Sequence, residues 1–351
     1  MRPFLFIVIV LVLFSCTSRH KERTDDCVEM KGMKVEIGDD ASLFEIVYAD
    51  DSLLVASVLS PTHLLESYDI GKKSAPHKFL RIGRGPKEVL NANIKSRNDT
   101  LFVMSYGMRG FQNLMKIPVS GIQDMPRWNS LDLPDWDGML PGRDFDVLHS
   151  SLYVVTGSYY EQENILSVLS EKSGVCTPLP FWPEDGRDDI PPLTKQLIYT
   201  RGARVFSNGD KILYSCNEGR YFTILDISSG DVSEIFIYDE YPEYEVSSDG
   251  INPSCKPGTK LGGIVCATDS LIFLSLLNCQ LADGKYIPSD YNGYPPYYND
   301  RIEVYDWDGE YQCTYVTDIP FSTFYANDKF IYALTINKET YMSEVYRYRI
   351  L

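Results

Sequence analysis

The chain lacks the sequence signatures of the common catalytic centres. It contains no H-E-x-x-H, G-x-S-x-G or G-x-x-x-x-G-K-[S/T] motif, and it has only four histidines. Those motifs supply a zinc-binding helix, a nucleophilic serine at a tight turn and a phosphate-binding loop, respectively. The histidines lie in expected loops or at strand edges. The sequence therefore assigns no catalytic residue, no metal ligand and no cofactor.

Runs of basic residues are also missing. The formal net charge is -16, and no lysine- or arginine-rich stripe interrupts the acidic composition. A surface that binds nucleic acid needs such a stripe to neutralise phosphates. The charge balance excludes nucleic acid as a partner and indicates a solvated acidic surface.

No C-x-x-C motif is present among the eight cysteines, which leaves a zinc ribbon or a thiol redox motif without support. Seven cysteines remain if Cys16 is modified, and an odd number cannot all pair within one chain. Cys255 and Cys279 would meet if the strands near 262–276 form a hairpin. The pairing of the others stays open.

No hydrophobic run is long enough to span a bilayer comfortably. The longest one, residues 4–14, follows Arg2 and ends at Ser15 and Cys16. This pattern resembles a bacterial lipoprotein signal, in which the cysteine is lipidated and becomes the first residue of the mature chain. We expect a signal peptide over 1–15, and lipidated Cys16 followed by a flexible tether over 16–32. The alternatives are an ordinary secretory signal and a short membrane anchor.

What the chain does contain is a repeat. Six short apolar segments are rich in branched and aromatic residues and align on Leu53, Leu101, Leu152, Ile212, Leu271 and Phe330. The intervals between them are 48, 51, 60, 59 and 59 residues. Periods of this size in an all-β sequence are typical of four-stranded propeller blades. We predict a six-bladed β-propeller over 33–351, with two separate β domains as the alternative.

The residues around each segment define its place in a blade. An earlier short strand ends just before each segment at a turn rich in Asn, Asp and Gly, and a third strand follows it. Each repeated segment is therefore predicted to be the second strand of an antiparallel blade. The sixth unit ends after its third strand, so we expect residues 33–37 to supply the missing outer strand and close the ring.

Four long connections are predicted to lie on one face of the disc, over 125–143, 181–200, 239–260 and 278–300. Long loops in compact domains are often functional. Their aromatic residues would suit sugar rings or extended peptides. The alternative is that they pack on one another and order the loops. The candidate ligand-binding aromatics are Trp128, Trp136, Trp182, Tyr291, Tyr294 and Tyr297.

The innermost strands are expected to place polar residues, Asn93 and Arg97 among them, on the wall of a central channel. Asp144 and Asp146 lie two apart on one strand and so share a face. A carboxylate pair of this kind binds a cation or assists acid–base chemistry. Arg201 and Arg204 join them as candidate binding residues. The alternative is a solvated channel wall.

The most specific local motif is "RIGRGPKEVL" at 81–90. Gly83 and Gly85 permit positive φ angles, and Pro86 stiffens the turn. Backbone N–H groups near Gly85 would suit an anion. No helix follows, so neither a dinucleotide nor a P-loop site is predicted. The other interpretation is a purely structural corner that includes Glu88.

The signal, the six irregular blades and the G-x-G-P-x-E corner together resemble the TolB-like six-bladed propeller lipoproteins of Bacteroidota. The resemblance covers nearly the whole chain, although only the signal and the corner are specific. It implies a cell-envelope protein with a propeller similar to NHL-repeat domains. It brings no catalytic set.

Three functions stay open from sequence alone. The first is a non-enzymatic binding module for a glycan, a peptide or an envelope protein, attached to the membrane only by its lipid. We expect it at the outer membrane and facing the periplasm, because no acidic run follows Cys16. The second is an envelope enzyme acting on a carbohydrate or related small molecule at the central funnel. The third is a passive scaffold.

Overall fold

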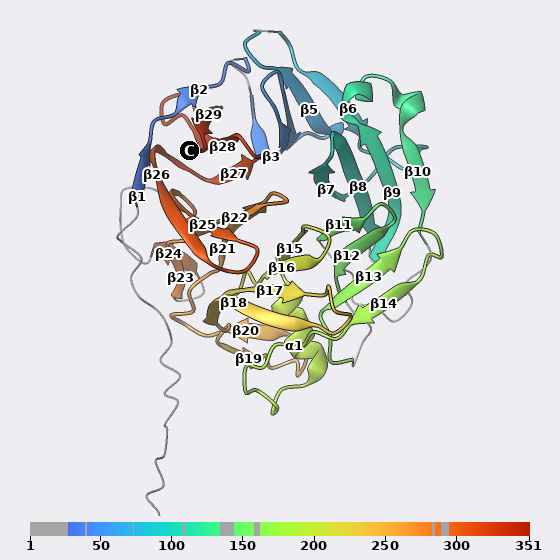
Figure 1. Cartoon of the computed structure of the whole chain (residues 1–351), viewed down its shortest axis with the longest axis vertical. Helices are drawn as coiled ribbons and strands as arrows, with labels where there is room; N and C mark the ends of the chain where they lie inside the picture. The colour runs from blue at the N-terminus through green and yellow to red at the C-terminus, as the bar shows by residue number, and fades with distance from the viewer. Residues whose placement is uncertain are drawn as a thin grey trace, which may run out of the picture.

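The computed structural model describes residues 27–38, 41–72, 74–107, 110–133, 144–157, 162–282, 285–288 and 295–351. Within them, six antiparallel sheets are arranged in a ring around a central axis (Figure 1). The fold is a six-bladed β-propeller, as predicted. Blades 1 to 3, each from its inner to its outer strand, are β3 (Leu43–Ala49), β4 (Leu53–Val58), β5 (His63–Asp69), β6 (His77–Arg81); β7 (Ala92–Arg97), β8 (Thr100–Gly107), β9 (Gly110–Pro118), β10 (Asn129–Asp132); and β11 (Phe145–His149), β12 (Leu152–Thr156), β13 (Leu166–Ser170), β14 (Cys176–Leu179).

Blades 4 to 6 follow in the same order around the ring. Their strands are β15 (Arg204–Ser207), β16 (Lys211–Ser215), β17 (Arg220–Asp226), β18 (Ser233–Glu240); β21 (Gly263–Ala267), β22 (Leu271–Leu276), β25 (Asn299–Asp306), β26 (Tyr311–Phe321); and β27 (Thr323–Ala326), β28 (Phe330–Ile336), β29 (Ser343–Arg349) with β2 (Met33–Lys34) outside. The six residues on which the repeat aligns are the first residue of a strand or lie within one. The strands are β4, β8, β12, β16, β22 and β28. Each is the second strand of its blade, as the repeat predicted.

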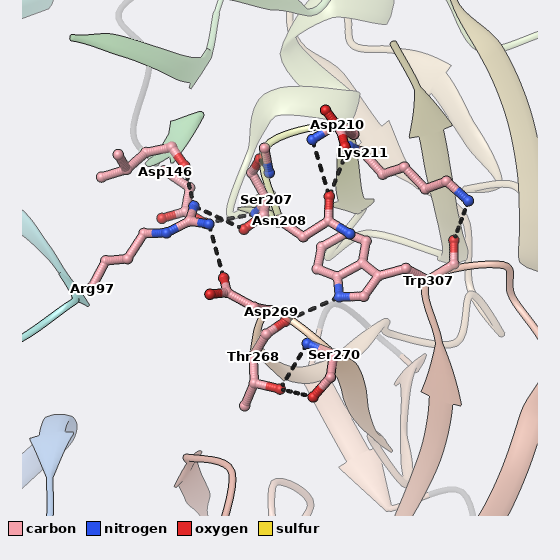
Figure 2. Close-up of polar contacts among 12 residues, drawn as sticks. Arg97, Asp146, Ser207, Asn208, Asp210, Lys211, Thr268, Asp269, Ser270 and Trp307 are labelled. Atoms are coloured by element: carbon pink, nitrogen blue, oxygen red, sulfur yellow. Dashed lines mark hydrogen bonds and ion pairs between the residues drawn. The ribbon is translucent and has the colours of Figure 1, made fainter. Parts of the chain in front are cut away.

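A polar side chain just ahead of the repeated segment organises the turn before the second strand. Asp50 Oδ1 accepts the backbone N–H groups of Ser52 and Leu53, at 2.7 and 2.8 Å. This side-chain turn replaces the hydrogen bonds that the ladder cannot make at a hairpin. The same arrangement recurs three residues before other second strands, at Asn208 and Thr268 (Figure 2) and at Asn327.

The hydrophobic core is divided among the blade interfaces. Each of the six larger buried clusters draws its residues mainly from two neighbouring blades. Leu54 and Val55, adjacent on β4 and both fully buried, show the reason. Leu54 packs toward blade 6 and Val55 toward blade 2, because successive side chains of a strand point to opposite faces. Second strands must therefore be apolar on both faces.

The ring closes as predicted, through an N-terminal strand in the last blade. β2 pairs antiparallel with β29, and the Val35 N–H adds a bond of 2.8 Å to the Val345 carbonyl. Residues 27–32, assigned to the tether from sequence, also belong to the propeller. β1 (Cys27–Met30) pairs in parallel with β26 of blade 5, and Met30 is 7% exposed. The strand is short and lies among polar residues, so the sequence shows no apolar strand pattern there.

Three insertions occupy the long connections and contain secondary structure that the sequence did not reveal. They are α1 (Pro192–Thr200), the β19 (Tyr244–Val246)–β20 (Pro253–Cys255) pair, and the β23 (Cys279–Ala282)–β24 (Lys285–Pro288) pair. The Thr194 hydroxyl donates to the Ile251 carbonyl at 2.6 Å, and the Gly258 N–H donates to the Leu281 carbonyl at 2.6 Å. Viewed down the ring axis, α1, β19 and β20 lie at the perimeter beside β18, not over the ring centre (Figure 1).

Two smaller expectations are also settled. The strands near 262–276 do form a hairpin, β21–β22, but Cys255 and Cys279 remain free thiols. Cys279 is fully buried, and Cys255 Sγ lies 3.2 Å from a Glu218 carboxylate oxygen.

Among the described residues, no helix has the length and apolar character needed to cross a membrane.

Candidate functional site

Two ion pairs cross the central channel between opposite blades. Arg204 on blade 4 lies 3.4 Å from the Glu45 carboxylate on blade 1, and Arg97 on blade 2 lies 2.8 Å from Asp269 on blade 5. Blades 1 and 4, and blades 2 and 5, face each other in a ring of six. The channel is therefore bridged at two levels and is not an open passage.

Arg97 makes the more extensive of these bridges. Besides Asp269, its guanidinium donates to the carbonyls of Val147 on blade 3 and Ser207 on blade 4, the latter at 3.1 Å (Figure 2). One planar donor group thus holds four blades together at the end where the first and second strands turn. Its role in the described structure is that of a structural bridge.

Lys95, two residues before Arg97, forms a partition in the middle of the channel. Its ammonium lies 3.1 Å from Asp144 Oδ2, donates to the Val205 carbonyl at 3.1 Å, and stands 3.8 Å over the centre of the Phe206 ring. The lysine is 9% exposed and Asp144 is 1% exposed. Asp144 Oδ2 also accepts the Val205 N–H, which joins blade 3 to blade 4.

Sequence reasoning missed Lys95, although a signal for it was present. Asn93 and Arg97 were both expected on the channel wall, and side chains two apart on a strand share a face. Strict use of that period would have placed Lys95 between them. Nothing else in the sequence of this strand distinguishes the lysine from an exposed one.

The two carboxylates expected to act together are separated by this partition. Asp146 Oδ2 accepts the Ser207 N–H at 2.7 Å on the turn side, whereas Asp144 lines the opposite side. Burial raises the pKa of Asp146 to about 6, and the nearby charges of Lys95 and Arg97 limit the rise. The two groups do not face one common hollow, which removes the geometry for a joint acid–base or cation site.

The bridged channel leaves a separate hollow at each end. The smaller, of about 220 Å³, opens between the short first-to-second-strand turns. The larger, of about 610 Å³, opens on the face that carries the insertions, and we call it the funnel. Connections between blades and between second and third strands supply part of its wall, including Leu59, Asn217 and Leu277.

The funnel wall is mixed in character. Phe44 and Leu59 are 61% and 80% exposed, and Tyr106 and Phe324 add further rings and apolar surface. Its charged residues are paired. Glu45 is the main cause that raises the pKa of the Arg204 guanidinium, and Asp144 adds to it.

Those predicted aromatic residues that the structure describes, Trp128, Trp182 and Tyr297, do not line the funnel. Trp128 is 3% exposed, donates its indole N–H to the Gly121 carbonyl at 3.2 Å, and packs between blades 1 and 2, near the short 3-10 helices η1 (Val119–Gly121) and η2 (Met125–Arg127). Trp182 packs under the Lys195 ammonium, 4.9 Å from the ring centre. Tyr297 is exposed. Arg201 is not among the residues that line either hollow. Cys16, Trp136, Tyr291 and Tyr294 lie outside the described residues.

The glycine corner makes room for its own glutamate. The Gly85 N–H donates to Glu88 Oε2 at 2.9 Å, so this carboxylate takes the place of an external anion. A Cβ on Gly83 would stand 2.1 Å from the same oxygen, so any other residue there would have to displace the Glu88 carboxylate. Neither Gly83 nor Gly85 has a positive φ angle, so the conformational freedom expected of them is not used. Pro86 lies inside this turn and Lys87 adopts a φ of 60°.

A second buried charge cluster anchors the insertions. Asp185 Oδ1 lies 2.6 Å from the Lys195 ammonium, and Oδ2 accepts the hydroxyls of Tyr199 and Tyr244 at 3.0 and 3.1 Å. Both carboxylate oxygens are therefore used within the protein, as expected for a structural cluster. No group of three or more metal-binding side chains occurs among the described residues.

Comparison with known proteins supports the fold alone. No model of a protein family matches the chain, and no curated protein matches it. A solved structure of a protein from Bacteroides fragilis, described as exported, is similar with a TM-score of 0.53 and 11% identity, over 93% of this chain and 99% of that one. A nidogen–laminin complex chain is less similar, with a TM-score of 0.42 and 8% identity over 83% and 91% of the two chains.

Proposed function

We propose that this protein is a binding protein of the bacterial cell envelope that holds a ligand in the funnel. The ligand is a small molecule, or the end of a glycan or peptide. The observation that carries the proposal is the funnel itself, a hollow of about 610 Å³ within the closed ring of blades. Small-molecule sites commonly measure about 300–1,000 Å³ and combine apolar walls with a few polar groups.

Because the bridges close the channel below the funnel, a ligand would reach the funnel only from the insertion face. Lys95 and Arg97 hold the blades together below the funnel, and neither needs to move for a ligand to enter from the insertion face. The exposed Phe44 and Leu59 side chains add apolar contact area at the wall. A rigid, preformed hollow reduces the entropy lost on binding.

The envelope location rests on the N-terminal sequence. The apolar run over 4–14 followed by Cys16 suits export and lipidation. The similar Bacteroides fragilis structure is described as that of an exported protein, which agrees with this address. A lipid on Cys16 would attach the propeller to the membrane while the propeller itself stays in the aqueous phase.

A thermal-shift screen of the full chain tests the binding proposal. The probes are cell-wall oligosaccharides, cell-wall peptides and divalent cations, each with and without chelator. A ligand at 100 times its Kd stabilises the fold by about 2.7 kcal/mol, a shift of roughly 4 °C in a domain of this size. A flat result across the whole panel would contradict a small-ligand site.

A matched pair of variants locates any ligand found. Phe44→Asp puts a charge on the funnel wall and should weaken binding at least tenfold. Phe236→Asp changes a similarly exposed ring on β18 and should leave affinity unchanged. Equal affinity of wild type and Phe44→Asp would place the site elsewhere.

Metabolic labelling with palmitate tests the anchor. Cells expressing the wild type should yield labelled protein in the membrane fraction, and Cys16→Ser should abolish the label and release the protein. Cys27→Ser, a change in β1, should keep both. An unlabelled wild-type chain would overturn the lipid anchor without affecting the funnel.

A further inference from the structure

Two buried polar atoms in the funnel have no hydrogen-bond partner among the described residues. They are Asp144 Oδ1, an acceptor, and Asn93 Nδ2, a donor. Asp144 is 1% exposed as a whole residue, and both residues line the funnel. The Arg204 guanidinium approaches Asp144 Oδ1 only to 3.8 Å, which is an ion-pair distance too long for a hydrogen bond.

Orphaned atoms of this kind are uncommon, because a buried donor or acceptor without a partner costs about 1–3 kcal/mol. The turn-side hollow uses its comparable groups internally, since Asp146 accepts the Ser207 N–H and Arg97 donates to two carbonyls. An acceptor and a donor without partners beside the same hollow therefore point to a ligand that, once neighbouring side chains shift to uncover these two buried atoms, supplies the missing partners.

The charges of the funnel floor indicate a neutral ligand. Glu45, Asp144 and Arg204 line the funnel. Lys95, which forms the partition and lines the turn-side hollow, pairs with Asp144, so two positive and two negative groups balance. A charged ligand would leave one charge uncompensated in a partly buried site, which is costly. A neutral ligand with both donor and acceptor capacity meets no such cost.

The positions of the two open atoms favour hydroxyl groups over an amide. Asn93 and Asp144 lie on the neighbouring blades 2 and 3, so both approach the ligand from one side of the ring. A trans peptide directs its N–H and its carbonyl in opposite directions. Each hydroxyl donates and accepts and rotates to suit its partner, so two adjacent hydroxyls satisfy both atoms from one side.

The walls complete this recognition. Tyr106, Phe206 and Phe324 surround the floor with aromatic rings, and Phe44 adds an exposed one. Flat apolar rings suit the C–H faces of a sugar while its hydroxyls reach the polar floor. We infer that the funnel binds a neutral sugar residue, with adjacent hydroxyls donating to Asp144 Oδ1 and accepting from Asn93 Nδ2. This inference rests on the proposed binding function.

Calorimetric titration of the full chain tests the ligand class. The probes are glucose, N-acetylglucosamine and their β-linked oligomers, their amino-sugar and uronic-acid counterparts, and a capped dipeptide amide. A neutral sugar should bind at least tenfold more tightly than its charged counterparts and than the dipeptide. Binding of the dipeptide with no binding of any sugar would overturn the sugar assignment and leave the proposed function standing. Absence of binding by every probe here, and by every ligand of the wider screen, would overturn both.

Two variants test the assigned atoms. Asn93→Leu should weaken sugar binding at least tenfold while the melting temperature stays equal or rises, because the change removes a buried donor that lacks a partner. Asp144→Asn should weaken binding comparably, with circular dichroism confirming that the blades remain folded. The control Asn113→Leu makes the same kind of change on β9, away from the funnel, and should bind normally.

Opposite results are equally informative. Full sugar affinity in Asn93→Leu would remove this residue from the site and overturn the inference. A large fall in its melting temperature would show that Asn93 serves the fold, and would also overturn it.

Discussion

The two ends of the channel are built on the same six inner strands, yet they differ in how far the protein satisfies its own polar groups. At the turn end, Arg97 donates to two carbonyls and pairs with Asp269, and Asp146 accepts a backbone N–H. At the funnel end, Asp144 Oδ1 and Asn93 Nδ2 are buried without a hydrogen-bond partner in the part of the chain that the structure describes. The comparison teaches that charge on a channel wall does not by itself mark a site, because charged groups that are paired within the protein serve the fold.

The Lys95–Asp144 pair separates the two ends, and breaking it should have the largest effect. Lys95→Met leaves a carboxylate that is 1% exposed without its closer cation, with only Arg204 at 3.8 Å, which should lower the free energy of unfolding by about 3–5 kcal/mol. Guanidinium unfolding followed by circular dichroism measures the loss. The double variant Lys95→Met/Asp144→Asn should recover part of it. A loss below about 1 kcal/mol would show that the partition is not a buried pair.

Arg97→Met should destabilise the turn end of the channel without changing ligand binding in the funnel. Loss of two charge-assisted hydrogen bonds to the carbonyls of blades 3 and 4 should cost about 2–4 kcal/mol in unfolding free energy. Ligand affinity in the funnel should change less than twofold, because Lys95 still closes the floor. A variant that keeps its stability but loses the ligand would reverse the roles assigned to the two ends.

The pH dependence of stability should report on Asp146. Its pKa is raised to about 6 in the folded protein, above the ordinary value of 3.8, so the folded state holds this proton more tightly than the unfolded state. The contribution of Asp146 to stability therefore falls as pH rises from about 4 to 6, by roughly 1–3 kcal/mol. Asp146→Asn should flatten that part of a urea-unfolding pH series. An unchanged slope would contradict a buried, desolvated Asp146.

Asp269→Asn should have the smallest effect. The Asp269 side chain is 69% exposed, and exposed ion pairs contribute about 0–1 kcal/mol. The same unfolding experiment should show a change below about 1 kcal/mol, which would leave the backbone carbonyls as the partners that matter to Arg97. A loss as large as that of Arg97→Met would assign the bridge to the ion pair instead.

The blade pattern was readable from sequence because it depends on local rules. A second strand must be apolar on both faces, and a polar residue three positions before it completes the turn, so the two signals recur together, as at Asp50 and Asn327. The closing strand at Met33 followed from the missing fourth strand of the last blade. These features need no knowledge of distant contacts.

The candidate site was only partly readable. Asn93, Arg97, Asp144 and Asp146 were placed correctly on the channel wall by the two-residue period of strands. Their partners were not predictable, since Arg97 pairs with a residue 172 positions away. Trp128 was expected at the rim because it lies in a long connection, but it packs between blades. Composition of a loop does not reveal which side chains fold back into the core.

By itself, then, the sequence determined the number of blades, the order of strands within each blade and the closure of the ring. These follow from hydrophobic period and turn chemistry along short stretches of chain. The tertiary structure alone decided which channel charges pair with one another and which buried polar atoms lack a partner among the described residues. Those choices depend on distances between opposite blades, which are set by the packing of all six blade interfaces together.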